Sequence, residues 1–162
     1  MSPVRLLFAI IITTALGAAS PANAQALLTH MKIVGLDGDA THRDHKGEIV
    51  LTGYSQTIGT RNCSRIVVTK LIDRASPGLI TRAATNFVTP QVSINIQRYV
   101  EGARAFFVVT LDQVTMERIE LAEQSEQLIE RVVLAPRAIR IEYKPQDDTG
   151  ATVPPIVSTF AC

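Results

Sequence analysis

The chain has 162 residues and carries 16 lysines and arginines against 15 aspartates and glutamates, a formal net charge of +1. So balanced a charge argues against a protein that binds nucleic acid or an anionic membrane surface mainly through charge. The length and the hydrophobic fraction of 46% suffice for one domain with a full core.

The start of the chain has the three parts of a secretory signal peptide. Arg5 supplies the positive charge, an apolar run follows, and Ala22-Asn23-Ala24 is a small-x-small cleavage pattern. The apolar run is shorter than the roughly 20 residues that a membrane-spanning helix needs. The sequence therefore predicts a signal peptide at residues 1–24 and cleavage between Ala24 and Gln25. It also predicts a secreted or periplasmic location, with no membrane contact after cleavage.

Two cysteines, Cys63 and Cys162, remain in the predicted mature chain of residues 25–162. Exported proteins meet an oxidising compartment, and an even count permits one bridge. In the chain-entropy model, closing a loop of this length stabilises the fold by up to about 4.7 kcal/mol. The sequence predicts a Cys63–Cys162 disulfide, and two free or intermolecular thiols are the alternative.

The first third of the mature chain contains two segments with strand-like alternation. Residues 27–36 place Met31 and Ile33 on one side, and residues 47–55 place Ile49 and Leu51 opposite mostly polar neighbours. The polar residues between these two predicted strands form a loop.

The segment from Cys63 to Thr85 combines a strand with the one helix that the sequence predicts. Ile66, Val68 and Ile72 alternate on one side of the strand. Ser76 is predicted to be the N-cap of the helix, because its hydroxyl can accept from a free backbone N–H, and Pro77 follows at the first helical position. The apolar side of the helix consists of Leu79, Ile80 and Ala83.

The second half of the chain is predicted to be almost entirely strand. The predicted strands are residues 90–100, 103–112, 114–121, 128–134, 138–144 and 156–162. Turn signals stand at Glu101-Gly102 and at residues 123–126. Eight or nine short strands with one helix predict a mainly β fold, an antiparallel barrel or sandwich.

The loop after the first predicted strand has an incomplete metal-binding pattern. Four of its residues match calcium-loop positions: Asp37, Asp39, Thr41 and Glu48. However, His42 stands where the sharp turn of that loop needs glycine. His42 and His45 could face zinc on a helix, but the segment lacks helical periodicity and offers no evident third ligand. The sequence therefore predicts no metal and no cofactor.

The chain also lacks a pattern of catalytic residues. Neither cysteine has a histidine near it in sequence, and there is no Gly-x-Ser-x-Gly motif. A set of glutamates alternating with Arg118 and Arg131 is typical of a solvated hairpin face. These glutamates are Glu117, Glu120, Glu123, Glu126 and Glu130. The sequence therefore predicts a protein that is not an enzyme.

Three ordered blocks of sequence span most of the mature chain. They are residues 31–49 with Met31-Lys32-Ile33, Gly35-Leu36-Asp37-Gly38 and His45-Lys46-Gly47-Glu48-Ile49, residues 69–77 (TKLIDRASP), and residues 139–150 with IRIEYKPQ followed by Asp148-Thr149-Gly150. In their order and spacing, these blocks resemble the Hcp family, the haemolysin-coregulated tube proteins of type VI secretion systems.

The resemblance implies a fold and a function. The implied fold is a small antiparallel β-barrel of two packed sheets with one short helix. The implied function is self-assembly into homo-hexameric rings, which in the family stack into a hollow tube that can hold small effector proteins. The implied partners are further copies of the chain, type VI secretion components and effector proteins. The alternative is a monomeric secreted or periplasmic binding module or effector built on the same barrel.

Overall fold

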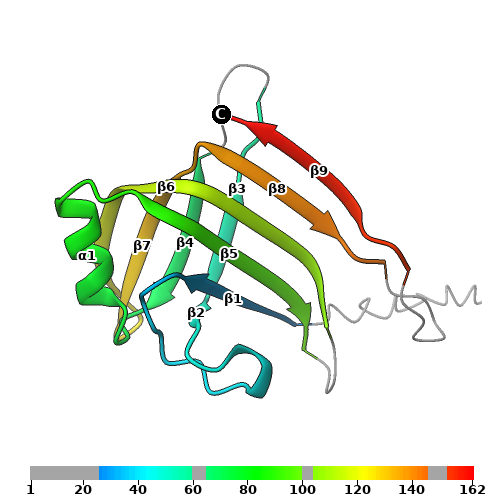
Figure 1. Ribbon diagram of the computed structural model, residues 1–162. Helices are drawn as coiled ribbons and strands as arrows, with labels where there is room; N and C mark the ends of the chain where they lie inside the picture. Colours follow the sequence, from blue (N-terminus) through cyan, green and yellow to red (C-terminus); the bar gives the residue numbers. More distant parts are fainter. Residues whose placement is uncertain (1–25, 60–64, 100–103, 146–152) are drawn as a thin grey trace, which may run out of the picture.

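The computed structural model describes residues 26–59, 65–99, 104–145 and 153–162 (Figure 1). The predicted signal peptide, its cleavage site, Cys63 and the turn at Glu101-Gly102 lie outside these ranges. No helix of the described ranges is long and apolar enough to cross a membrane.

The described residues form nine strands, one α-helix and one short 3-10 helix. The strands are β1 (Leu27–Ile33), β2 (Ile49–Leu51), β3 (Gly53–Gln56), β4 (Ile66–Leu71), β5 (Thr89–Arg98), β6 (Ala105–Gln124), β7 (Gln127–Ala135), β8 (Ala138–Tyr143) and β9 (Ile156–Ala161). The helices are α1 (Ser76–Ala84) and η1 (Arg43–His45). The mainly β class with one short α-helix is thereby confirmed.

All nine strands belong to one large antiparallel sheet. Its main path runs β2-β1-β5-β6-β7-β4-β3, and β8 lies beside β6 with β9 as its outer neighbour. Figure 1 shows the sheet strongly curved, with α1 at one end and β8 and β9 extending along the opposite side. The family resemblance implied a closed barrel of two packed sheets, whereas the described strands form one continuous sheet.

The core lies on the concave face of this sheet, and period-two alternation supplies it. Met31 on β1, Ile49 on β2, Ile94 on β5 and Leu134 on β7 are fully buried in one cluster. Burying each such side chain stabilises the fold by about 1.5–3 kcal/mol relative to leaving it exposed. The inward faces predicted for β1 and β2 are confirmed.

Strand β6 corrects the prediction of two separate strands at 103–112 and 114–121. Its first half lies between β5 and β8, and its second half lies beside β7. Gln113 has a positive φ of 51°, and the register with β7 shifts between Met116 and Arg118. Each irregularity moves the inward side chains by one residue, so the alternation breaks although the strand continues.

The prediction of a single strand at 47–55 is also wrong, because Thr52 divides it. Strand β2 lies against β1 and strand β3 lies against β4. The backbone N–H of Thr52 donates to Thr69 O at 2.8 Å, which holds this junction against β4.

Helix α1 begins differently from the prediction. Ala75 occupies the N-cap position with an αR backbone and makes no side-chain cap, and Ser76 is the first helical residue. Leu79 is fully buried, whereas Ile80 is exposed. The buried side of the helix therefore does not include all three of the predicted residues. The Ser76 hydroxyl is used in a buried cluster between the helix and the sheet.

Candidate functional site

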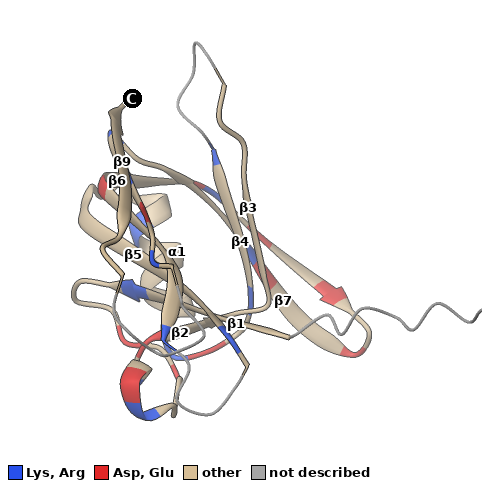
Figure 2. Ribbon diagram, turned by 90° about the vertical axis from the view of Figure 1, so that its right-hand side faces the viewer, with Lys and Arg blue, Asp and Glu red and all other residues tan. Residues whose placement is uncertain are grey.

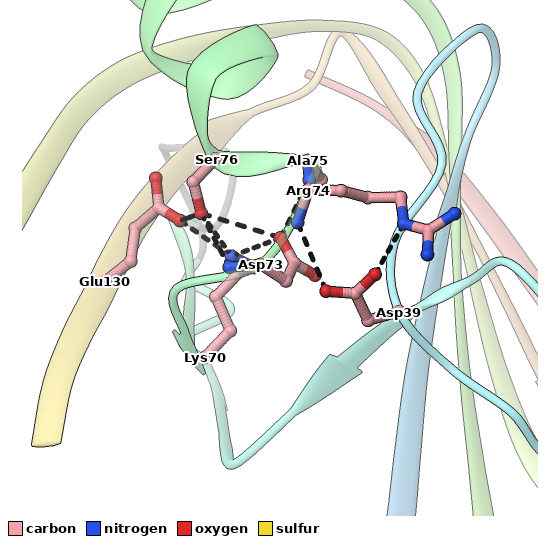
Figure 3. Close-up of polar contacts among 7 residues, drawn as sticks. All are labelled: Asp39, Lys70, Asp73, Arg74, Ala75, Ser76 and Glu130. Carbon is pink, nitrogen blue, oxygen red and sulfur yellow. Dashed lines mark hydrogen bonds and ion pairs between the residues drawn. The ribbon is translucent and has the colours of Figure 1, made fainter.

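A buried ionic cluster joins β4, β7 and the start of α1 (Figure 3). Lys70 and Glu130 are Cα partners on β4 and β7, and both side chains are fully buried on the core face. The Lys70 ammonium lies 2.8 Å from Glu130 Oε2, 2.8 Å from Ser76 Oγ and 2.8 Å from Asp73 Oδ1. The Ser76 hydroxyl in turn donates to Glu130 Oε2 at 2.8 Å.

This arrangement attaches the helix to the sheet and does not activate a nucleophile. An ammonium has three donors, and each of the three donors of Lys70 has an oxygen within reach. A lysine held charged between two carboxylates has no lone pair with which to take the proton of Ser76. The Lys70–Ser76 contact therefore does not have the roles of a base and a nucleophile.

Sequence reasoning missed Lys70 and misplaced Glu130. Lys70 follows Ile66 and Val68 on the inward side of β4, and this parity was the signal that could have found it. Ile72, which was predicted to share this side, lies beyond the end of β4 and is exposed, so that prediction is wrong. Glu130 was grouped with the glutamates of a solvated hairpin face, but it is buried, which corrects that interpretation. Glu117 and Glu120, by contrast, are partly exposed and lie beside Arg65, Arg118 and Arg131.

A second polar cluster lies on the outer face of the sheet and contains all three histidines of the sequence. The rings of His30 on β1 and His45 on η1 are stacked, with centroids 4.3 Å apart and planes 6° apart. The His42 ring lies 5.7 Å from His45 and 6.1 Å from His30. His45 Nδ1 is 2.8 Å from Glu48 Oε2, and its Nε2 is 3.0 Å from Gln97 Oε1.

The histidine cluster differs from the solvated loop that the sequence predicted. The structure brings His42 and His45 together with Glu48, and it adds His30 and Gln97, which sequence reasoning missed. His30 is 3% exposed, and burial lowers its pKa, with a further lowering from the nearby His45. Within the described ranges, no three or more His, Cys, Asp or Glu residues are arranged to hold a metal ion.

Asp39, another of the four calcium-loop candidates, has a structural partner. Its carboxylate accepts from the Arg74 Nε–H and, at 3.3 Å, from the Arg74 backbone N–H. The side-chain hydrogen bond from Arg74 is the main cause of a lowered pKa of Asp39. This contact joins the loop of residues 36–48 to the turn before α1.

Strand β9 is an open edge of the sheet. Among the described residues it has a neighbour on the β8 side only, and none of its own residues is charged (Figure 2). Ile156 is 67% exposed, and Val157 and the adjacent Tyr143 of β8 are exposed as well. Cys162 follows directly after β9, while the predicted bridge to Cys63 reaches outside the described residues and stays a prediction.

The fold and these sites define a class of protein. Both buried clusters hold segments of the chain in place, and an uncharged, partly apolar strand edge is suited to pairing with another chain. These features are those of a mainly β structural protein with one strand edge suited to pairing.

The comparisons with known proteins agree with this class. The sequence model of a family described as "Type VI secretion system effector, Hcp" matches residues 30–143, which is most of the chain. The chain therefore belongs to the Hcp family, the tube proteins of type VI secretion systems. This is a family of structural proteins, so the prediction that the chain is not an enzyme is confirmed. A search of curated proteins finds no match.

Several solved structures share the fold. Hcp1 from Salmonella typhimurium superposes with a TM-score of 0.75 at 21% identity, covering 84% of this chain and 94% of that one. A type VI secretion system effector from Yersinia pestis gives 0.72 at 16% identity, covering 83% and 99%. The secreted protein Hcp3 from Pseudomonas aeruginosa gives 0.66 at 16% identity, covering 84% and 98%. At these identities the similarity establishes the fold.

Proposed function

We propose that the protein is an exported tube-type subunit that assembles into homo-hexameric rings. Membership of the Hcp family supports self-assembly. The single observation that carries the proposal is the open edge of β9, which is uncharged and exposes Ile156 and Val157. Natural edge strands usually carry charges, prolines or covers that prevent pairing, and β9 has no charge and no proline.

The hydrogen-bond pattern shows which backbone groups of β9 remain for a second chain. Cys162 N donates inward to Arg137 O at 2.7 Å. In an antiparallel pair, alternate residues point their N–H and C=O groups toward the same neighbour. The backbone groups of Phe160 and Ser158 therefore point toward β8, and those of Thr159 and Val157 point away from it.

A ring requires the β9 edge to meet a different surface on the next copy. Heterologous contacts repeat head to tail and close when the rotation between copies allows it, whereas β9 against β9 produces a two-fold dimer. We assign the β9 edge to the ring contact, with further copies of the chain as the first partners. Such rings would then bind other type VI secretion components and effector proteins.

Three further features belong to the same proposal. The two ends of the sheet path, β2 and β3, are separated in sequence by Thr52 alone, and this supports closure of the sheet into a small barrel of two packed sheets. Cleavage between Ala24 and Gln25 would deliver this domain to a secreted or periplasmic location. The proposed Cys63–Cys162 bridge is supported by the placement of the C-terminus at the same end of the molecule as the start of β4 (Figure 1).

The experiment that tests ring assembly compares variants at Thr159 by native mass spectrometry and light scattering. The purified protein should contain about six subunits. Thr159→Pro removes an outward N–H without removing a bond to β8, so it should yield monomers with an unchanged circular dichroism spectrum. Thr159→Val keeps the N–H and is the matched control, which should retain the ring.

Three results would overturn the assignment. A wild-type protein that stays monomeric at high concentration supports the alternative of a monomeric binding module or effector. A stable dimer indicates β9 pairing with itself. An intact ring in Thr159→Pro places the contact elsewhere on the molecule.

Export and the bridge are tested separately from assembly. Periplasmic or culture-medium material should begin at Gln25, and its mass without reductant should be lower by the two hydrogens lost on oxidation. Full-length protein confined to the cytoplasm would contradict the export proposal. A mass unchanged by reductant would contradict the bridge.

A further inference from the structure

The outer face of β1 buries a histidine beneath a loop. Met31 and Ile33 of β1 face the core, so His30 points to the opposite side of the sheet. Residues 36–48 cover it there, and His45 stacks on its ring. The outer face of an antiparallel sheet is commonly solvated, so a histidine that is 3% exposed at this place reports a closed cover.

Contacts within the loop and with its neighbours hold it closed over His30. His45 supplies two of them, to Glu48 in the loop itself and to Gln97 on β5. The loop also has its own backbone bonds, from Gly38 N to Gly47 O at 2.8 Å and from Ala40 N to Glu48 O at 2.9 Å. The stacked His30–His45 pair and the bond to Gln97 are therefore the main side-chain attachments of the loop to β1 and β5.

The closed arrangement does not accommodate a proton on His30. Both nitrogens of His45 already face oxygens, Glu48 Oε2 and Gln97 Oε1. Among the described residues, His30 Nδ1 is buried without a hydrogen-bond partner. A proton on this nitrogen would create a buried donor without an acceptor, in a ring whose centre lies 4.3 Å from that of His45.

The groups around His30 do not offset that charge. The loop contributes His42, His45 and Glu48, of which Glu48 alone raises the pKa of His30. The residues opposite His30 on the neighbouring strands, Val50 of β2 and Asn95 of β5, are uncharged. Lys32 lies on the same side of β1 and is exposed. Burial and then the effect of His45 outweigh Glu48, so the pKa of His30 lies below its ordinary value of 6.5.

We propose that His30, His45, Glu48 and Gln97 form a pH-sensitive latch, which holds residues 36–48 closed over β1 at neutral pH and releases them in mild acid. Opening exposes His30 to water and restores its ordinary affinity for a proton. The open form therefore binds the proton more tightly than the closed form. The free energy that keeps the loop closed is fully present above pH 6.5 and falls as the pH drops through the lowered pKa of His30.

Hydrogen exchange on the purified protein tests the latch. The amides of Gly38, Ala40 and Gly47 report opening of the loop, because their acceptors lie within it. After correction for intrinsic exchange rates, their opening constants should rise severalfold between pH 7.5 and pH 5.0. The amides of β4 and β7 should show no matching rise.

His30→Phe is the decisive variant, because it keeps a ring against His45 and removes the titration. Its loop opening should be independent of pH over the same range. His42→Asn changes the exposed third histidine, the smallest influence on His30, and should keep the pH dependence of the wild type. A pH-independent wild type, or a His30→Phe variant with unchanged pH dependence, overturns the proposal.

A measurement on the wild type alone covers a His30→Phe variant that fails to fold. The NMR signals of the His30 ring should titrate below pH 6.5, and the amide signals of Gly38 and Ala40 should change along the same curve. Titration of His30 at or above pH 6.5, or loop signals that follow a different curve, contradicts the latch. Neither result depends on whether the protein forms rings.

Discussion

The ionic cluster and the histidine cluster have the same structural role on opposite faces of the same sheet. Each attaches a non-strand segment to the strands through buried polar side chains. On the core face, Lys70 and Glu130 hold the start of α1. On the outer face, His30 and His45 hold the loop of residues 36–48.

The two clusters differ in how their charges are balanced. Lys70 lies between the carboxylates of Glu130 and Asp73 and forms an ion pair with each of them. Histidine is the side chain whose ordinary charge change falls between pH 5 and pH 8. The comparison indicates that the core-face cluster is a fixed attachment, and that the outer-face cluster is an attachment that pH can release.

The largest expected effect comes from breaking the fixed attachment. Lys70→Met removes the ammonium and leaves the Glu130 carboxylate buried without its partner, which should destabilise the protein by about 3–5 kcal/mol. Chemical denaturation measures this loss.

The matched control replaces both members of the pair. Lys70→Met with Glu130→Leu removes the two buried charges together, so the double variant should be more stable than Lys70→Met alone. A single variant within about 1 kcal/mol of the wild type would contradict a buried ion pair. A double variant less stable than the single one would assign the stabilisation to the wider network with Ser76 and Asp73.

A smaller loss of stability is expected from a substitution in the backbone of the loop of residues 36–48, which the histidine cluster attaches to the sheet. A Cβ at Gly38 would lie 2.5 Å from Glu48 O and 2.6 Å from Ile49 Cα, and backbone atoms cannot move aside cheaply. Gly38→Ala should cost about 1–3 kcal/mol and raise exchange at Ala40. Gly59→Ala is the control, because nothing lies within 4 Å of its added Cβ. Equal stability of the two variants would contradict a tightly closed loop.

The strands and their core faces were predictable from sequence, because alternation is a local property. The clusters were predictable only in part. Lys70 and Glu130 both occupy inward positions, on β4 and β7, but they are 60 residues apart, so nothing local shows that they pair. His30 lies on the outward side of β1, where alternation predicts exposure, and only the return of the loop buries it. The continuous β6 was missed because its bulges interrupt the period that identifies a strand.

The smallest expected effect concerns an exposed contact that joins the two regions. Asp39 of the loop pairs with Arg74 in the turn before α1, and both side chains are exposed. Asp39→Asn should therefore reduce stability only slightly, and added salt should remove the difference, since exposed pairs are screened.

The side-chain hydrogen bond from Arg74 lowers the pKa of Asp39 below its ordinary value of 3.8. The difference between the wild type and the variant should be full above that value and vanish as the pH falls below it. Denaturation in low and high salt at pH 6 and pH 3 measures both trends. A difference that survives high salt would show that the loop and the helix start are coupled more strongly than two exposed side chains allow.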